Sequence, residues 1–212
     1  MKRLYVVGDG LTEVRFVTEI LKPHLEKQSD WLFAVSAPRL PGQFTYAKLK
    51  RDLKRLLGPA GSAVVVTSMI DLFKIAGDFP GRGDPQDNAQ PAERVQYLEK
   101  CFADDVADPR FLPHLQLHEF EALLLWDVEL LARQHPNRSK AIEKLGKRLR
   151  REFPTPEHVN RLRPPSYWIL EAVPEYKKVV DGIVTAERIG LDRLRRNCPH
   201  FGRWLDRLES AV

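Results

Sequence analysis

Two aspartates stand at the ends of the two strands that the sequence predicts most clearly. Asp9 follows the apolar run RLYVV in a Gly-Asp-Gly turn, and Asp71 ends the run VVVTSMID. Ligands of an open parallel sheet bind beyond the carboxyl ends of its strands. Two carboxylates at neighbouring strand ends offer the oxygen ligands that a hard cation such as Mg²⁺ prefers. Each aspartate taken alone is equally explained as a turn or cap residue, so the pair carries the prediction.

A second acidic group occurs in the segment QLHEFEALLLW. At about 100° per helical residue, Glu121 lies on an apolar arc between Leu124 and Leu125. Glu119 falls beside Trp126 instead. An ionised carboxylate on a buried face is costly unless it is paired or bound to metal. Glu121 therefore needs a partner, which is either an arginine or a cation.

Two further side chains are secondary candidates. Glu13 lies in the first helical turn after Asp9, where the helix dipole favours an acid with or without a function. His118 precedes Glu121 by three residues. It is a candidate ligand or proton shuttle, and a capping role explains it equally well.

Alternating strands and helices position these residues. The strand RLYVVGDG is followed by a helix that Thr12 is expected to cap, and a short apolar segment follows at Trp31 to Val35. After a loop rich in proline and glycine, Thr45 opens a second helix, which Gly58 and the next proline end. The run SAVVVTSMID has the continuous apolar character of a strand buried on both faces. This β-α-β-α-β order predicts a doubly wound parallel sheet.

The rest of the chain is predicted to be mostly helical. Residues 74–91 form a long loop, Pro91 begins a helix that runs to about residue 104, LPHLQL is a strand, and HEFEALLLWDVELLAR is an apolar helix. Prolines then interrupt the helices. We expect an α/β core over residues 1–132 and a helical extension over 133–212, packed together as one folded unit.

Composition narrows the class of protein. The chain has 212 residues, of which 43% are hydrophobic, enough to bury a core. Its apolar runs are far shorter than the roughly 20 residues that span a bilayer, and the start lacks the pattern of a signal peptide. We therefore expect a cytoplasmic protein with no membrane partner. Cys101 and Cys198, the two cysteines, match no paired metal-ligand spacing.

Positive charge is concentrated between Arg133 and Arg163, where ten Lys or Arg stand against three acids. A solvated helix face explains this pattern as well as a contact with the phosphates of a nucleic acid does. The second reading predicts binding that weakens with salt.

Taken in order, these segments resemble the family DUF4276, whose members are Toprim-like α/β domains related to the overcoming-lysogenization-defect (OLD) nucleases. The resemblance runs nearly end to end. Its landmarks are VVGDGLTEVRFV, SMIDLFKIAGDFPG, LHEFEALLL and IGLDRLRRNCPHFGRWLDRL. It implies a Toprim or Rossmann-like three-layer domain with a mostly parallel sheet and a helical C-terminal extension.

The resemblance also implies phosphodiester hydrolysis that depends on Mg²⁺ or Mn²⁺. It implies a nucleic-acid substrate, with DNA favoured over RNA, and an ABC-type ATPase partner in defence against phage. Lys74 or an arginine of the basic segment would position the substrate. Carried over by position, the catalytic residues are Asp9, Asp71, Glu121 and His118, and the metal ligands are Asp9, Glu13, Asp71, Glu119 and Glu121.

This sequence departs from the family pattern at three positions. Asp9 replaces the usual glutamate, and the pair of Toprim aspartates is reduced to Asp71, so that Asp78 or Glu121 would have to supply the second. Tyr167 stands where related sequences often have a lysine. These departures keep open an alternative, a non-catalytic subunit that binds nucleic acid or is held by an ATPase. The oligomeric state stays open as well.

Overall fold

The computed structural model describes residues 2–28, 33–37, 45–59, 61, 63–88, 90–159 and 163–211. The chain forms two compact units, Met1–Leu117 with Asp206–Val212, and His118–Leu205. Each unit is described by itself below. The predicted division into a core and an extension at residue 132 stays a prediction.

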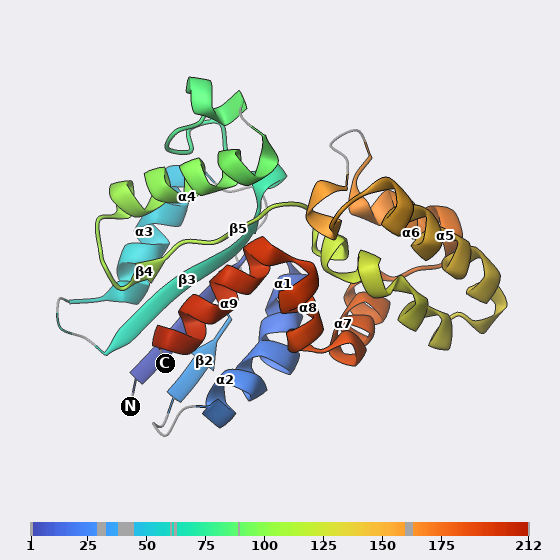
Figure 1. Cartoon of the computed structure of the whole chain (residues 1–212). Helices are drawn as coiled ribbons and strands as arrows, with labels where there is room; N and C mark the ends of the chain where they lie inside the picture. Colours follow the sequence, from blue (N-terminus) through green and yellow to red (C-terminus); the bar gives the residue numbers. More distant parts are fainter. Residues whose placement is uncertain are drawn as a thin grey trace. The chain divides into compact units, whose positions relative to one another are not determined.

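A parallel sheet forms the centre of the first unit (Figure 1). The strand order is β2-β1-β3-β4, and β5 also pairs with β3, every pair being parallel. This arrangement confirms the predicted α/β class with its parallel central sheet. The strands are β1 (Lys2–Gly8), β2 (Phe33–Ser36), β3 (Val64–Asp71), β4 (Phe111–Leu112) and β5 (Leu115–Gln116).

Two helices, α3 (Tyr46–Leu57) and α4 (Pro91–Val106), pack on one face of this sheet. Their apolar side chains share a core with Val7 of β1 and with Val66 and Ile70 of β3. Since successive side chains of a strand point to opposite faces, Leu4, Val6 and Met69 lie on the other face. A continuous helical run contacts β1 and β2, and consists of α1 (Leu11–Phe16), η1 (Val17–Leu21) and α2 (Lys22–Gln28).

Helix boundaries follow the predicted caps in one case and not in another. The cap at Thr45 is confirmed, because its side chain accepts a hydrogen bond from the Lys48 N–H (3.3 Å). Helix α3 ends at Gly58, whose φ of 61° is a conformation that glycine adopts readily. The predicted cap at Thr12 is wrong: Gly10 precedes α1, and Thr12 is buried inside the first turn.

The predicted strand at Trp31 to Val35 corresponds to β2. Trp31 itself lies outside the described residues, as does most of the loop that follows β2. Strand β3 is buried from Val65 to Asp71, as its continuous apolar run predicts.

An aromatic cluster anchors the long segment between β3 and α4, which includes η2 (Leu72–Lys74) and η3 (Pro85–Asn88). Phe79 is buried, and its ring centroid lies 5.2 Å from that of Tyr46 and 4.9 Å from that of Phe102. These edge-to-face contacts tie the segment to α3 and α4. Part of the expected loop is therefore fixed against the core.

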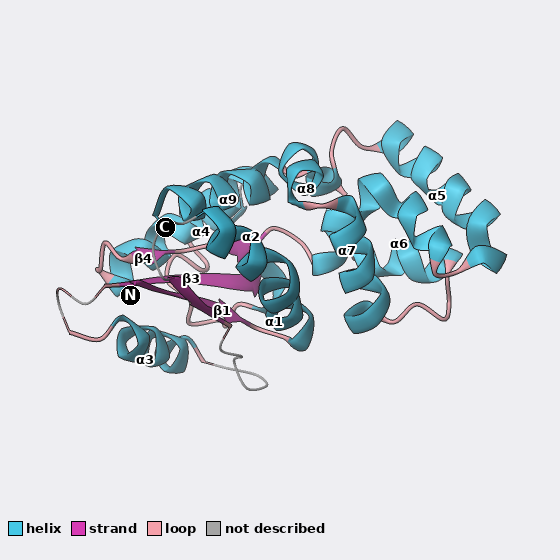
Figure 2. Cartoon of the chain, turned by 90° about the horizontal axis from the view of Figure 1, so that it is seen from below, coloured by secondary structure: helices cyan, strands magenta, loops and turns pink. Residues whose placement is uncertain are grey.

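The second unit consists of helices and turns in its described residues (Figure 2). Its apolar centre is η4, on which α5, α6 and α7 pack. No helix among the described residues of the chain is long and apolar enough to span a membrane. The elements are η4 (Phe120–Arg133), η5 (Pro136–Arg138), α5 (Ser139–Glu152), η6 (Pro156–His158), α6 (Pro165–Ala172), η7 (Lys178–Gly182), α7 (Ile183–Ile189), α8 (Leu191–Asn197) and α9 (Pro199–Ala211), whose last residues belong to the first unit.

The apolar helix predicted at residues 118–133 is a 3₁₀ helix, η4, that begins at Phe120 and is interrupted at Asp127 (φ −121°, ψ 26°). The Asp127 carboxylate accepts a hydrogen bond from the Asn197 side-chain amide (2.8 Å) and pairs with Arg193. These contacts fix Asp127 at the interruption. Apolar periodicity alone cannot show such a break, because its cause lies far along the chain.

Glu157 caps the start of α9 from a distant part of the sequence. Its Oε1 atom accepts hydrogen bonds from the backbone N–H groups of His200 (2.7 Å) and Phe201 (3.2 Å). The first N–H groups of a helix have no acceptor within the helix, and this carboxylate supplies one. Burial raises the pKa of the Glu157 carboxyl.

We expect Glu157→Ala to lower the free energy of unfolding by about 1 kcal/mol, the usual cost of losing a cap. Glu157→Gln keeps the acceptor oxygen and removes the charge. Because the folded-state pKa of Glu157 is raised, the wild type should lose stability relative to Glu157→Gln as pH rises from 4 to 7. Urea unfolding of the three proteins at several pH values measures both effects. A constant difference between wild type and Glu157→Gln would contradict the expected titration.

Candidate functional site

The carboxyl ends of β1 and β3 bring Asp9 and Asp71 together. The Asp71 N–H donates to Asp9 Oδ2 over 3.2 Å. The register explains this contact, because Gly8 pairs with Met69 and both strands end within two residues of that pair. Only 1% of the Asp9 side chain is exposed.

One oxygen of Asp9 has no hydrogen-bond partner among the residues that the structure describes. Asp9 Oδ1 is buried, whereas Oδ2 also lies 3.2 Å from Nζ of Lys74. A buried carboxylate oxygen without a donor is costly unless a cation or a water satisfies it. Asp71 differs, because its Oδ1 accepts a hydrogen bond from the Phe73 N–H (2.9 Å) and so caps η2.

Glu13 is buried beside the same turn. A Cβ atom at Gly10 would lie 2.5 Å from Oε2 of Glu13, and one at Gly8 would lie 3.2 Å from its Cβ. Glycines on both sides of Asp9 thus make room for the Glu13 side chain. Three carboxylates, from Asp9, Glu13 and Asp71, therefore gather at this edge of the sheet.

Their nearest oxygens do not all lie within 4.8 Å of one another, and the same holds for every acidic trio in the described part of the first unit. One ion could touch all three only after a side chain rotates. Asp78, the suggested substitute for a second Toprim aspartate, has a contact of its own. Its Oδ1 accepts a hydrogen bond from the Tyr46 N–H (3.2 Å) at the start of α3.

Glu121 is fully buried in the second unit and is paired with a lysine. Nζ of Lys178 lies 2.9 Å from its Oε2 atom, and 31% of the Lys178 side chain is exposed. Apart from this ion pair, neither Glu121 oxygen has a partner among the described residues. Burial raises the pKa of the Glu121 carboxyl, and the charge of Lys178 opposes that rise.

Tyr176 lies beside this pair, and its buried hydroxyl has no hydrogen-bond partner among the described residues. Burial, reinforced by the charge of Glu121, raises the pKa of the Tyr176 phenol. A Cβ atom at Gly182 would lie 2.7 Å from the hydroxyl, so the glycine makes room for it. Glu121, Tyr176 and Lys178 form a buried polar group whose hydrogen bonds are incomplete.

The other two candidates of the second unit are held by backbone groups. Glu119 Oε2 accepts a hydrogen bond from the Ser166 N–H (3.0 Å) in the first turn of α6. His118 is buried, and its Nε2 atom lies 2.9 Å from the carbonyl oxygen of Glu157. Both contacts are of the kind that stabilises a fold. The catalytic and metal-binding roles of these residues stay predictions.

The predicted set is therefore divided between the two units. Asp9, Glu13 and Asp71 belong to the first unit, and His118, Glu119 and Glu121 to the second. Within the first unit the carboxylates converge, as two neighbouring strand ends require.

The basic side chains between Arg133 and Arg163 differ in their surroundings. Arg150 pairs with Glu129, and Arg138 with Glu175 (3.1 Å). Arg161 lies outside the described residues. Five of the other basic side chains line one shallow hollow on α5, together with Glu143: Lys140, Lys144, Lys147, Arg148 and Arg151.

Sequence reasoning missed the partners of the buried acids. Lys178 and Tyr176 lie more than 50 positions from Glu121 along the chain, and no short motif marks them. Glu99 and His114 were also missed. Glu99 Oε1 accepts a hydrogen bond from the Leu115 N–H (2.7 Å) and lies 3.5 Å from Nδ1 of the buried His114.

We expect Lys178→Met to lower the free energy of unfolding by about 2–3 kcal/mol, because it leaves the Glu121 carboxylate buried without a counter-charge. The double variant Glu121→Gln, Lys178→Met should recover most of that loss. Urea unfolding of the wild type, both single variants and the double variant gives the coupling energy. Additive losses would show that the two side chains do not interact.

Comparison with known proteins gives one family and two solved structures. The structures, phased with mercury and with iodine, are of the C-terminal region of the Xanthomonas campestris pv. campestris OLD protein. They are 15% and 14% identical to this chain, cover all of it and 96% of their own chains, and have TM-scores of 0.48 and 0.47. None of the curated proteins matches. The family DUF4276, described as a domain of unknown function, matches residues 9–209, and the chain belongs to this family.

Proposed function

We propose that this protein is a metal-dependent phosphodiesterase that acts on nucleic acid, with its metal site at the carboxyl ends of β1 and β3. One observation carries the proposal. Asp9 Oδ1 is a buried carboxylate oxygen that has no hydrogen-bond partner in the described part of the chain, and the carboxylates of Asp71 and Glu13 lie near the same edge of the sheet. A divalent cation would satisfy that oxygen.

The donor set fits Mg²⁺ or Mn²⁺. All three side chains offer carboxylate oxygens, which these hard cations prefer, and glycines flank Asp9 so that the backbone leaves space around it. Asp9 and Asp71 would hold the ion, with Glu13 as a further ligand. A metal-binding role of Glu121, which belongs to the second unit, is a separate prediction.

A bound divalent ion lowers the pKa of coordinated water and stabilises negative charge on a phosphate. The chain's own residues would do the remaining work. Lys74 has 49% of its side chain exposed, and its ammonium group would bind a phosphate oxygen of the substrate when it leaves Asp9. The exposed ring of Phe73, next in sequence to the cap at η2, would contact a neighbouring sugar or base.

A second candidate function, a binding subunit without catalysis, is favoured by two contacts. Lys74 already neutralises Asp9, and the Phe73 N–H already occupies Asp71 Oδ1. A metal ion would have to displace Lys74 from Asp9, and the Asp71 carboxylate would have to rotate away from the Phe73 N–H. A protein in which these contacts persist would keep the α/β fold and bind no ion.

We expect 10 mM Mg²⁺ or Mn²⁺ to raise the Tm of the wild type. A Kd one hundred times below the metal concentration would add about 2.7 kcal/mol of stability, or roughly 5–10 °C. Asp9→Asn and Asp71→Asn should lose this shift. Asp104→Asn is the matched control, because that aspartate is exposed and pairs with the exposed Lys100 (2.6 Å). Equal shifts in all four proteins would place metal binding elsewhere.

We also expect metal-dependent cleavage of plasmid, linear or single-stranded DNA, or of RNA, with loss by a factor of about 100 or more in Asp9→Asn and Asp71→Asn. Glu121→Gln tests the contribution of the second unit. Gel assays with both metals, with and without a candidate ATPase, measure the activity. A metal-induced Tm shift without cleavage under any of these conditions would favour the binding subunit.

A further inference from the structure

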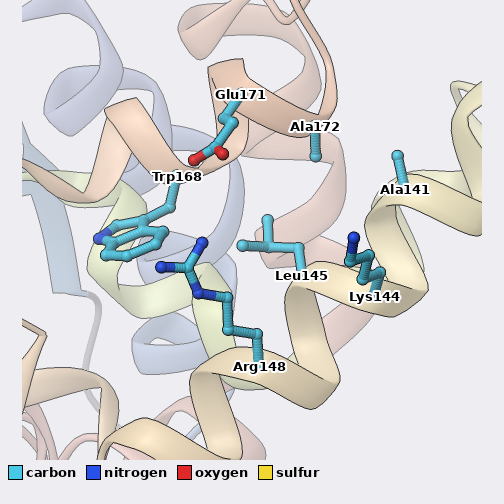
Figure 3. Close-up of a pocket in the computed structure, with 7 residues that line it drawn as sticks. All are labelled: Ala141, Lys144, Leu145, Arg148, Trp168, Glu171 and Ala172. Carbon is cyan, nitrogen blue, oxygen red and sulfur yellow. The ribbon is translucent and has the colours of Figure 1, made fainter.

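Helices α5 and α6 are neighbours in the second unit (Figure 1). Side chains of both helices line a hollow. Its volume is about 230 Å³. Figure 3 shows Leu145 between the two charged side chains of α5, Lys144 and Arg148, with the carboxylate of Glu171 on the opposite side. The apolar lining is Ala141, Leu145, Trp168 and Ala172.

Arg148 is held in place from two sides. Its guanidinium carbon lies 4.6 Å from the ring centroid of Trp168, and its Nε atom donates to Glu152 over 3.0 Å. These contacts orient the guanidinium at the hollow before any ligand arrives. Lys144 has no acidic partner within 4.0 Å among the described residues, so its charge is available.

The shallow hollow that basic side chains of α5 line shares Lys144 and Arg148 with the α5–α6 hollow, so the two are adjacent. At 1.5 Å per residue, the row from Lys140 to Arg151 extends for about 16 Å, enough for more than one phosphate. Besides the pair of Arg148 with Glu152, the row has two exposed ion pairs, Lys147 with Glu143 (2.6 Å) and Arg151 with Glu152 (3.6 Å). Such pairs contribute little and exchange readily for phosphate.

An exposed aromatic ring lies at the start of α6. Tyr167 is 45% exposed, and the guanidinium carbon of Arg163 lies 5.0 Å from its ring centroid. The ring centroid of Tyr167 is 6.4 Å from that of Trp168, which lines the apolar hollow. Basic side chains interleaved with an exposed aromatic ring are the pattern of surfaces that bind single strands.

We propose that the α5–α6 face binds single-stranded nucleic acid, with one unstacked base in the apolar hollow and the phosphates along the basic row. The side chains that line the hollow support single-stranded nucleic acid as the ligand. The apolar walls contact a base, and Lys144 and Arg148 donate hydrogen bonds to its phosphates. Glu171 accepts a hydrogen bond from an amino group such as N4 of cytosine. A paired base inside a duplex cannot enter such a hollow. The inference goes beyond the proposed function, since this binding needs no metal.

The test measures binding of fluorescein-labelled 12-nucleotide oligomers in EDTA, at 50–200 mM salt. We expect oligo-dC to bind more tightly than oligo-dT, an abasic oligomer or a duplex of the same length, each by a factor of about five or more. In Lys144→Gln, Lys147→Gln, the slope of log affinity against log salt should fall in magnitude by about 1.4, which corresponds to two phosphate contacts on a single strand.

Two more variants separate selection of the base from binding of the phosphates. Glu171→Ala should reduce the preference for dC over dT by a factor of about three or more while leaving the salt slope unchanged. Lys177→Gln is the matched control, because this exposed lysine of the same unit lines neither hollow. It should bind like the wild type. All these residues are at the surface, and equal Tm values would confirm that each variant folds.

Duplex binding as tight as single-strand binding, or an unchanged salt slope in the double lysine variant, would overturn the proposal. Asp9→Asn separates it from the proposed function. That variant should bind the oligomers normally and fail to cleave. Wild-type protein that cleaves but shows no effect of the lysine and Glu171 variants on binding would overturn only this inference.

Discussion

The parallel pairing of β1 with β3 is the interaction on which the first unit depends. The two strands pair from Arg3 with Val64 to Gly8 with Met69, and β3 is buried on both faces. A parallel pair must end both strands at the same edge, so this register alone brings the side chain of Asp9 to the backbone of Asp71. Helices cover both faces of the sheet, and Asp9 is buried although it lies in a turn.

The two units solve the problem of a buried carboxylate differently. Asp9 receives one N–H and one ammonium group on Oδ2 and leaves Oδ1 without a donor. Glu121 has the ammonium group of Lys178 2.9 Å from Oε2, and the Tyr176 hydroxyl nearby has no hydrogen-bond partner among the described residues. Most buried polar groups in proteins are satisfied, so groups that are not mark either a ligand site or stored instability. The lysine partners matter most here, since an ammonium group can leave for a phosphate while the carboxylate stays in place.

Local sequence patterns predicted the first unit better than the second. The β-α-β-α-β order, the Thr45 cap and the buried strand β3 rest on neighbouring residues, and the structure confirms them. Apolar periodicity also gave the buried position of Glu121. It could not give its partner, because Lys178 reaches it through a chain reversal that no local pattern encodes. The break in η4 at Asp127 and the cap from Glu157 on α9 escaped prediction for the same reason.

The basic segment shows that the role of a run of charged residues depends on which groups their side chains contact. As a sequence, residues 133–163 are equally well read as a solvated face. In the structure, Arg138 pairs with Glu175 at 3.1 Å and Arg150 pairs with Glu129. Lys144 of the α5 row has no acidic partner among the described residues, and it lies beside an apolar hollow. A solvated face requires no apolar hollow, and a packing surface between helices would bury Lys144 rather than leave it exposed. The combination of an oriented guanidinium, an exposed ammonium group and a carboxylate around one apolar space is what a ligand with both a base and a phosphate requires.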